Sequence, residues 1–267
     1  MSSSVMKVFL LAGQSNMTGR AVVTGLAPSV LEPMPAVQFD NVSSLGADAK
    51  RAGPRAHYRT DGWMPLQPSP KLPSTSADHF GLELTFGRTL AERWPGQPLA
   101  IIKHGRGGTS LAEDWAVGAV SGLMLYRQFL AQVQAALGRL RAAGTAYEVA
   151  ALVWAQGEAD ATRQNWAEHY QVNLEQLVAR MRADLAVPDL PVFLVLTGDG
   201  KKNFSMHFAA QVRAAQSALS AADPRIGLVS GDDLTLLDAV HYDAASQLTL
   251  GRRAAEAYLA LTAAGSP

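Results

Sequence analysis

The sequence predicts one doubly wound α/β domain, with helices on both faces of a central sheet. Short apolar segments rich in Val, Ile and Leu alternate along the chain with amphipathic segments of helical length. The apolar segments are continuous, as expected of strands buried on both faces of a parallel sheet. This regular alternation disfavours an all-α or all-β fold. The 267 residues, 48% of them hydrophobic, suffice for one large core.

The elements follow in order along the chain. Strands are predicted at residues 5–12, 99–103, 149–154, 192–197 and 226–230, and helices at residues 80–94, 123–143, 165–185, 204–221 and 244–261. The opening apolar segment is too short to span a membrane and runs directly into a candidate catalytic motif. We therefore interpret it as the first strand and not as a signal peptide. Both a cytoplasmic protein and an exported protein that has lost its leader are compatible with this interpretation.

Residues 24–78 are the exception to the alternation. They are rich in Pro, Gly, Ser and Asp and have no sustained hydrophobic period. A long loop inside a compact domain usually has a function. Because this segment follows the first strand, we expect it to emerge at the carboxyl edge of the sheet, where open α/β folds bind ligands. We interpret it as a loop insertion that covers the substrate side.

The composition excludes several classes of function. The formal net charge is zero, so the chain lacks the basic surface that binds nucleic acid or anionic membranes. It contains no cysteine, which excludes disulfides, a thiolate nucleophile and zinc fingers. The six histidines include no H-x-x-x-H or H-E-x-x-H pair. We therefore expect no metal site.

A candidate nucleophile follows the first strand in the motif Gly13-Gln14-Ser15-Asn16-Met17. A serine there lies at the carboxyl edge of the sheet, near the start of a helix whose free N–H groups favour developing negative charge. The motif lacks the second glycine of the G-x-S-x-G elbow. The alternative is that Ser15 or Asn16 only caps the helix.

A candidate base precedes the last helix in the motif Asp238-Ala239-Val240-His241. At this spacing the carboxylate can hold one imidazole nitrogen while the other faces outward, as a general base requires. The alternative is a surface turn in which Asp238 caps the helix. His104, at a strand end, is the competing base, but no carboxylate lies near it in the sequence to orient its ring.

Two further motifs end predicted strands. In the segment 104–110, consecutive glycines let the backbone approach a ligand and direct an N–H at it, as an oxyanion hole needs. In the segment 154–160, the side-chain amide of Gln156 could stabilise an oxyanion, and Glu158 and Asp160 could support the glycine-rich loop or contact substrate hydroxyls. Three of the four motifs end strands and the fourth precedes the last helix, so all should meet at one edge of the sheet.

With these motifs in place, the chain resembles the SGNH hydrolase superfamily, and within it the branch of sialate O-acetylesterases and acetylxylan esterases. Gly13-Gln14-Ser15-Asn16-Met17 is similar to the serine block of that branch. Gly107-Gly108-Thr109-Ser110-Leu111 with Trp115 is similar to its glycine block. The segment 154–160 corresponds to its third block and the segment 238–241 to its terminal dyad.

The resemblance implies a flavodoxin-like three-layer sandwich with a central five-stranded parallel sheet and an esterase without a cofactor. Ser15 would attack the ester, His241 would carry the proton, and Asp238 would hold the imidazole ring. The implied oxyanion hole consists of Ser15, Gly107, Gly108 and Gln156. We expect five further residues to contact the substrate or support the catalytic ones: Gln14, Asn16, Arg106, Trp115 and Glu158.

The expected reaction is the hydrolysis of acetyl or short acyl esters, on carbohydrates such as acetylated xylan or sialic acid. One alternative is an SGNH lipase-like or thioesterase-like hydrolase of longer acyl esters, which would need an apolar channel. Polar and aromatic residues of the long loop favour a carbohydrate instead; they are Arg51, Arg55, His57, Tyr58, Arg59, Asp61 and Trp63. The other alternative is a non-catalytic carbohydrate-binding relative, which would not need the base beside the serine.

Overall fold

The computed structural model describes residues 5–44, 57–71, 75–201 and 205–264. The predicted strands are present as β1 (Met6–Gly13), β7 (Leu99–Arg106), β8 (Tyr147–Ala155), β9 (Val192–Val195) and β10 (Ile226–Val229). They join β3 (Met34–Ser44) and β4 (His57–Arg59) in one sheet of order β10-β9-β8-β1-β7-β3-β4, and β5 (Met64–Leu66) also pairs with β3. All pairings from β10 to β3 are parallel.

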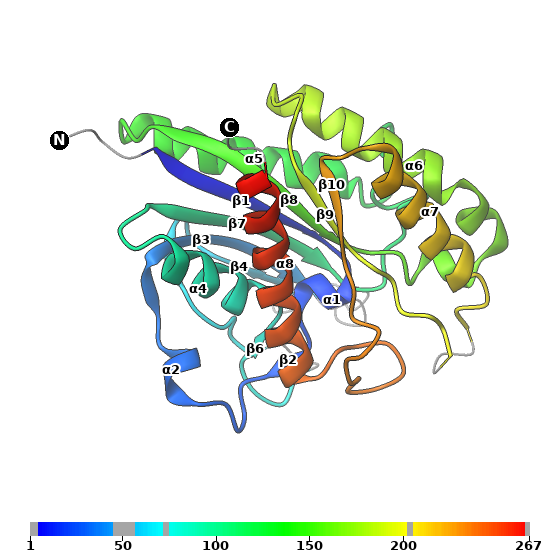
Figure 1. Cartoon of the computed structure of the whole chain (residues 1–267), viewed down its shortest axis with the longest axis horizontal. Coiled ribbons are helices and arrows are strands. Elements are labelled where there is room, and N and C mark those ends of the chain that lie inside the picture. Colours follow the sequence, from blue (N-terminus) through cyan, green and yellow to red (C-terminus); the bar gives the residue numbers. More distant parts are fainter. Residues whose placement is uncertain (1–4, 45–56, 72–74, 202–204, 265–267) are drawn as a thin grey trace.

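Helices cover both faces of this sheet (Figure 1). They are α4 (Glu83–Arg93), α5 (Leu125–Ala142), α6 (Gln164–Leu185), α7 (Ala209–Ala222) and α8 (Ala244–Ala264). The helix expected at 204–221 begins only at Ala209, and Phe204 lies outside the described residues. The predicted three-layer α/β fold is confirmed. Within the described residues, no helix combines the length and the hydrophobicity needed to cross a bilayer.

Side chains of β1 alternate between two apolar cores. Val8 and Leu10 belong to the core beneath α5, α6 and α7, whereas Phe9 and Leu11 belong to the core beneath α4 and α8. All four side chains are fully buried. This explains the unbroken apolar run in the sequence, because a central strand covered on both faces has no solvent-facing positions.

The predicted count of five strands is wrong, because part of the expected loop forms β3. This strand adds a sixth parallel strand to the sheet, and β4 and β5 pair with it in antiparallel orientation. Its sequence is not an apolar run, since Asn41 and Ser43 are buried polar residues. Asn41 Nδ2 donates to Ser69 Oγ at 2.8 Å, and Ser43 Oγ donates to Asn41 Oδ1 at 2.7 Å. Side-chain hydrogen bonds, one of them to the distant Ser69, thus stabilise these buried positions in place of apolar packing.

The described part of the long segment comes to the carboxyl edge at Ser44, where the end of β3 pairs with the end of β7. From His57 it returns along β3 at the side of the sheet, so Tyr58 and Arg59 lie there and not over the carboxyl edge. Arg51 and Arg55 lie outside the described residues. The expectation of a covering loop therefore rests on a stretch that is not described.

Short elements line the carboxyl edge. They are α1 (Ser15–Thr18), β2 (Ala21–Val22), β6 (His79–Phe80) and the 3-10 helix η2 (Asp160–Thr162), whereas α2 (Pro28–Leu31) precedes the amino end of β3. The neighbouring strands β1, β7 and β8 end together, since Gly13 is paired with Gly105 on one side and with Ala155 on the other. The segments that follow these three strands therefore start side by side.

Candidate active site

Ser15 is the first residue of α1, directly after the end of β1. It is buried, with an exposed fraction of 6%. The N-cap is Gln14, and no side chain caps this helix. The alternative that Ser15 or Asn16 is only a helix cap is therefore wrong. Within the described residues, neither the backbone N–H nor the hydroxyl of Ser15 has a hydrogen-bond partner.

Asp238 and His241 form a close pair. His241 Nδ1 lies 2.7 Å from Asp238 Oδ2, and Asp238 Oδ1 accepts the backbone N–H groups of Val240 and His241, both at 2.8 Å. Burial alone would raise the pKa of Asp238, but these hydrogen bonds lower it. The alternative that Asp238 caps the last helix is wrong, because Asp243 Oδ1 accepts the N–H of Ser246 at the start of α8.

Asn16 joins the segment of the serine to the segment of the histidine. Its Nδ2 donates to Val240 O at 3.2 Å, and its Oδ1 accepts the N–H of Tyr242 at 3.2 Å. The residues on both sides of His241 are thus bonded to the neighbour of Ser15. The segments that carry the candidate nucleophile and the candidate base, predicted at opposite ends of the chain, therefore lie side by side at one edge of the sheet. Among the described residues no hydrogen bond joins Ser15 to His241, whose side chain is bonded to Asp238 alone, so a direct contact between the two belongs to the proposed function.

Glu158 is the third partner of Asn16. Its Oε1 accepts from Asn16 Nδ2 at 2.6 Å, and its Oε2 has no partner within the described residues. Burial raises the pKa of the Glu158 carboxyl, and the hydrogen bond from Asn16 partly offsets this. Glu158 therefore does not hold the glycine-rich loop, which was one of its two expected roles.

Asp160 holds the glycine-rich loop instead. Its two carboxyl oxygens accept the N–H groups of Leu111 at 2.8 Å and Ala112 at 3.0 Å. Burial raises the pKa of Asp160 to about 6, against the effect of these hydrogen bonds. Trp115 also supports this loop, since its buried Nε1 donates to Thr109 Oγ1 at 3.1 Å. Arg106 ends β7 and remains partly exposed beside the loop.

Two predicted oxyanion donors are already engaged. The N–H of Gly107 donates to Ser44 O at 2.8 Å, because β3 extends beside β7 to that point. The amide nitrogen of Gln156 lies 2.5 Å from Asp160 Oδ2 and 3.1 Å from Thr109 O, which uses both of its hydrogens. The prediction that the Gly107 N–H and the Gln156 amide form part of the oxyanion hole is therefore wrong.

The N–H of Gly108 remains available. Gly108 is exposed, has a φ of +69°, and its N–H has no acceptor within the described residues. Gln14, which was expected near the substrate, is instead buried beneath the loop after β8, where its Oε1 accepts the N–H of Ala159 at 3.3 Å. Gln14 thus supports the loop that follows β8.

His104 does not have the environment of a base. It is 3% exposed, its Nδ1 lies 2.8 Å from Gln132 Oε1, and its ring packs against Trp115 and Phe129. Burial lowers the pKa of His104 to about 4. His241 therefore has no competitor in His104.

A buried ion pair supports the helix of the serine, and the sequence analysis missed it. Lys103 Nζ lies 2.7 Å from Glu83 Oε2, with both side chains fully buried, and donates to Thr18 O at 2.9 Å. Burial lowers the pKa of Lys103, and Glu83 partly offsets this. The signal in the sequence was a lysine inside an apolar strand, since such a residue is almost never fully buried unless it is paired.

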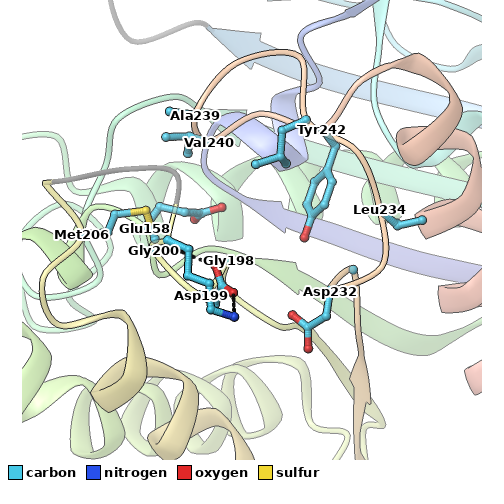
Figure 2. A pocket seen from close by; sticks show the side chains of 13 residues that line it. Glu158, Gly198, Asp199, Gly200, Met206, Asp232, Leu234, Ala239, Val240 and Tyr242 are labelled. Carbon is cyan, nitrogen blue, oxygen red and sulfur yellow. Dashed lines mark hydrogen bonds and ion pairs between the residues drawn. The ribbon is translucent and has the colours of Figure 1, made fainter.

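A small cavity of about 140 Å³ adjoins the segment of the histidine (Figure 2). Its wall includes Val240 and Tyr242 from that segment, Glu158, and the carboxylates Asp199 and Asp232. Neither Ser15 nor His241 is among the residues that line it. Both acidic residues have cationic partners, Lys201 and Arg213 respectively.

A doubly wound α/β fold that gathers polar motifs at the carboxyl edge of its sheet has the architecture of an enzyme that binds its substrate at that edge. Residues 5–260 match the family described as carbohydrate esterase, sialic acid-specific acetylesterase. The chain belongs to this family and is a carboxylic ester hydrolase. The predicted resemblance and enzyme class are confirmed.

Several known proteins are similar to the chain. The probable carbohydrate esterase At4g34215 of Arabidopsis thaliana is 27% identical over 263 residues, which cover 95% of this chain and 90% of that protein. Its solved structure has a TM-score of 0.71 over 95% of this chain and 98% of its own, at 24% identity. The structure of NanS has a TM-score of 0.73, with 19% identity and 99% of each chain covered.

A third structure, XAC1771, is described as a carbohydrate acetylesterase from Xanthomonas citri. Its TM-score is 0.66 at 18% identity, covering 97% of this chain and 57% of that one. At such identities the structural matches establish the shared fold.

Proposed function

We propose that the protein is a serine esterase that removes acetyl or other short acyl groups from carbohydrates, such as acetylated xylan or acetylated sialic acid. Ser15 is the nucleophile, His241 the base and Asp238 the residue that orients the base. The observation that carries the proposal is the 2.7 Å contact between His241 Nδ1 and Asp238 Oδ2, in a segment bonded to the neighbour of Ser15. The family description supports the acetyl and carbohydrate parts.

The first half of the reaction acylates the enzyme. Because Nδ1 of His241 faces Asp238, Nε2 is the nitrogen that takes the proton of the Ser15 hydroxyl. Ser15 Oγ forms a bond to the acyl carbon, and the π electrons of the C=O bond move to the carbonyl oxygen. When this intermediate collapses, the bond to the sugar oxygen breaks and His241 returns the proton to that oxygen.

The second half releases the acid. His241 takes a proton from a water molecule, whose oxygen bonds to the acyl carbon. The bond to Ser15 Oγ then breaks, His241 protonates the serine, and acetate leaves. In both halves we assign the oxyanion to the N–H groups of Ser15 and Gly108, since the other two predicted donors have protein acceptors.

Substitution of the nucleophile tests the proposal. We expect Ser15→Ala to lower the turnover of a chromogenic acetate by roughly a million-fold, as loss of a triad nucleophile does. The control is Ser220→Ala, which removes a hydroxyl that donates to Ile226 O, on a helix remote from the site. Equal rates in Ser15→Ala and the parent would show that Ser15 is not the nucleophile, whereas a parent that hydrolyses none of the esters would favour a non-catalytic binding relative.

The acyl and sugar preferences need their own measurement. We expect the rate to be highest for acetate in a series of esters from acetate to octanoate. A maximum at octanoate would favour a lipase-like hydrolase. Acetate release from acetylated xylan and from acetylated sialic acid, measured side by side, then identifies the preferred carbohydrate.

A further inference from the structure

Asn16 lies between the two halves of the proposed catalytic machinery. It follows Ser15 directly, and its side chain is 97% buried, being only 3% exposed. Its amide makes hydrogen bonds on both sides of His241, to Val240 O and from the N–H of Tyr242. Its own carbonyl accepts from Gln247 Nε2 at 3.2 Å, on the helix that follows the histidine. The position of the His241 backbone relative to Ser15 is thus set by one side chain.

Glu158 fixes the orientation of that side chain. Nδ2 of Asn16 has two hydrogens, and the acceptors for them are Val240 O and Glu158 Oε1. If the side-chain amide of Asn16 were flipped, its oxygen would face the two acceptors Val240 O and Glu158 Oε1. Its NH₂ group would then face the N–H of Tyr242, which is also a donor. The contact with Glu158, at 2.6 Å, is the shorter of the two, as expected of a hydrogen bond to a carboxylate.

We propose that Asn16 and Glu158 are positioning residues that place His241 over Ser15 for proton transfer. The proposal rests on the proposed function. Neither residue touches the reacting atoms, so both act through His241. Removing Asn16 deletes both hydrogen bonds to the segment 238–242, and removing Glu158 deletes the bond that orients the Asn16 amide. Either change lets the imidazole move, and a misplacement of about 1 Å can cost about a hundredfold in rate.

The expected kinetic result is a loss confined to turnover. We expect Asn16→Ala and Glu158→Ala to lower kcat by about 10- to 100-fold with KM for a chromogenic acetate unchanged. Glu158→Gln keeps an acceptor oxygen for Asn16 Nδ2, so we expect it to stay within a few-fold of the parent kcat. A rise in KM at constant kcat in Glu158→Ala would overturn the proposal, because it would make Glu158 a substrate contact.

Asp40→Ala is the matched control for Glu158→Ala. Asp40 Oδ1 accepts from Gln132 Nε2 at 2.6 Å, so this is also a buried bond between an amide and a carboxylate, but it lies on β3 away from the site. We expect Asp40→Ala, which removes this bond, to lower the midpoint of thermal unfolding and to leave kcat unchanged. A similar loss of kcat in both variants would reduce the role of Glu158 to general stability.

A double variant distinguishes positioning from other roles. If Glu158 acts through His241, adding Glu158→Ala to His241→Ala lowers the residual rate no further, while the unfolding midpoint still falls. A further tenfold loss would overturn the proposal. If Glu158→Ala does not fold, Asn16→Ala in the same two backgrounds gives the same comparison.

The failure of this proposal differs from the failure of the proposed function. If Ser15→Ala and His241→Ala keep the parent rate, the catalytic assignment is wrong. If both are inactive while Asn16→Ala and Glu158→Ala keep the parent kcat, only the positioning role is wrong.

Discussion

Asp160 and Asp238 are chemically identical side chains whose surroundings give them different properties. The side chain of Asp160 is fully buried, and burial raises its pKa to about 6 although it accepts hydrogen bonds. Asp238 is 45% exposed, and its hydrogen bonds with His241 and Val240 lower its pKa despite partial burial. Asp238 therefore stays ionised at neutral pH, as the partner of a catalytic imidazole must. Asp160 holds a loop.

The residue scale gives a prediction for Asp238→Asn. The amide can still accept the backbone N–H groups of Val240 and His241, so the turn should keep its shape. It cannot hold the imidazole in the required tautomer, so we expect kcat to fall by roughly 10⁴-fold. Steady-state hydrolysis of a chromogenic acetate measures this loss.

Asp243→Asn serves as the comparison. It alters a residue that hydrogen-bonds at the start of α8, two positions after His241. We expect little change in kcat or in the free energy of unfolding, because asparagine caps a helix about as well as aspartate. The assignment of Asp238 would be wrong if the two variants lost activity equally.

At the scale of elements, the turn from β1 to α1 depends on close backbone contact. A Cβ on Gly13 would lie 2.0 Å from Ala155 O, and the φ of Gly13 is +152°. A Cβ on Gly105 would similarly lie 2.7 Å from the Cα of Thr18. The segment that carries Ser15 can therefore pack against β7 and β8 only because both positions are glycine.

Gly13→Ala tests this packing. We expect it to lower the free energy of unfolding by roughly 3 kcal/mol or more, from backbone strain and steric overlap together. We also expect kcat to fall, because the overlap displaces Ser15. Denaturant titration and steady-state kinetics measure the two effects.

Gly96→Ala separates strain from overlap. Gly96 has a φ of +82° but would meet no atom within 4 Å of a new Cβ. We expect a loss of only about 1–2 kcal/mol, with kcat unchanged. Equal destabilisation in the two variants would mean that close packing at Gly13 is unimportant.

At the scale of the whole molecule, the two helical layers bury ionisable groups that the reaction does not use. Burial lowers the pKa of His104 and of His79 to about 4 each. Each histidine has a pKa near 6.5 when unfolded, so the unfolded chain binds more protons between these values. The stability that neutral histidines provide is present above about pH 6.5 and is lost as the pH falls towards about 4.

His104→Gln should make this acid dependence shallower. We expect the fall in the unfolding free energy between pH 6.5 and 4 to shrink by up to about 3 kcal/mol, because the difference in pKa is about 2.5 units. Chemical denaturation at several pH values measures the slope. The exposed His169→Gln should leave the slope unchanged, and an unchanged slope in His104→Gln as well would contradict the prediction.

Sequence alone determined the elements whose pattern is local. The strands β1, β7, β8, β9 and β10 are apolar runs because the sheet is covered on both faces, and the helices between them have one apolar side. The meeting of Ser15 with the Asp238–His241 segment was predictable as well, because the carboxyl ends of parallel strands lie along one edge.

Only the tertiary structure decided the partners of polar groups. The sequence pattern did not predict β3, because its buried Asn41 is stabilised by a hydrogen bond to Ser69, which lies far along the chain. Gly107 and Gln156 were assigned to an oxyanion because their N–H groups suit that role, but Ser44 and Asp160 already accept from them. A local pattern shows which donors a segment carries. Their acceptors come from segments that only the folded chain brings alongside.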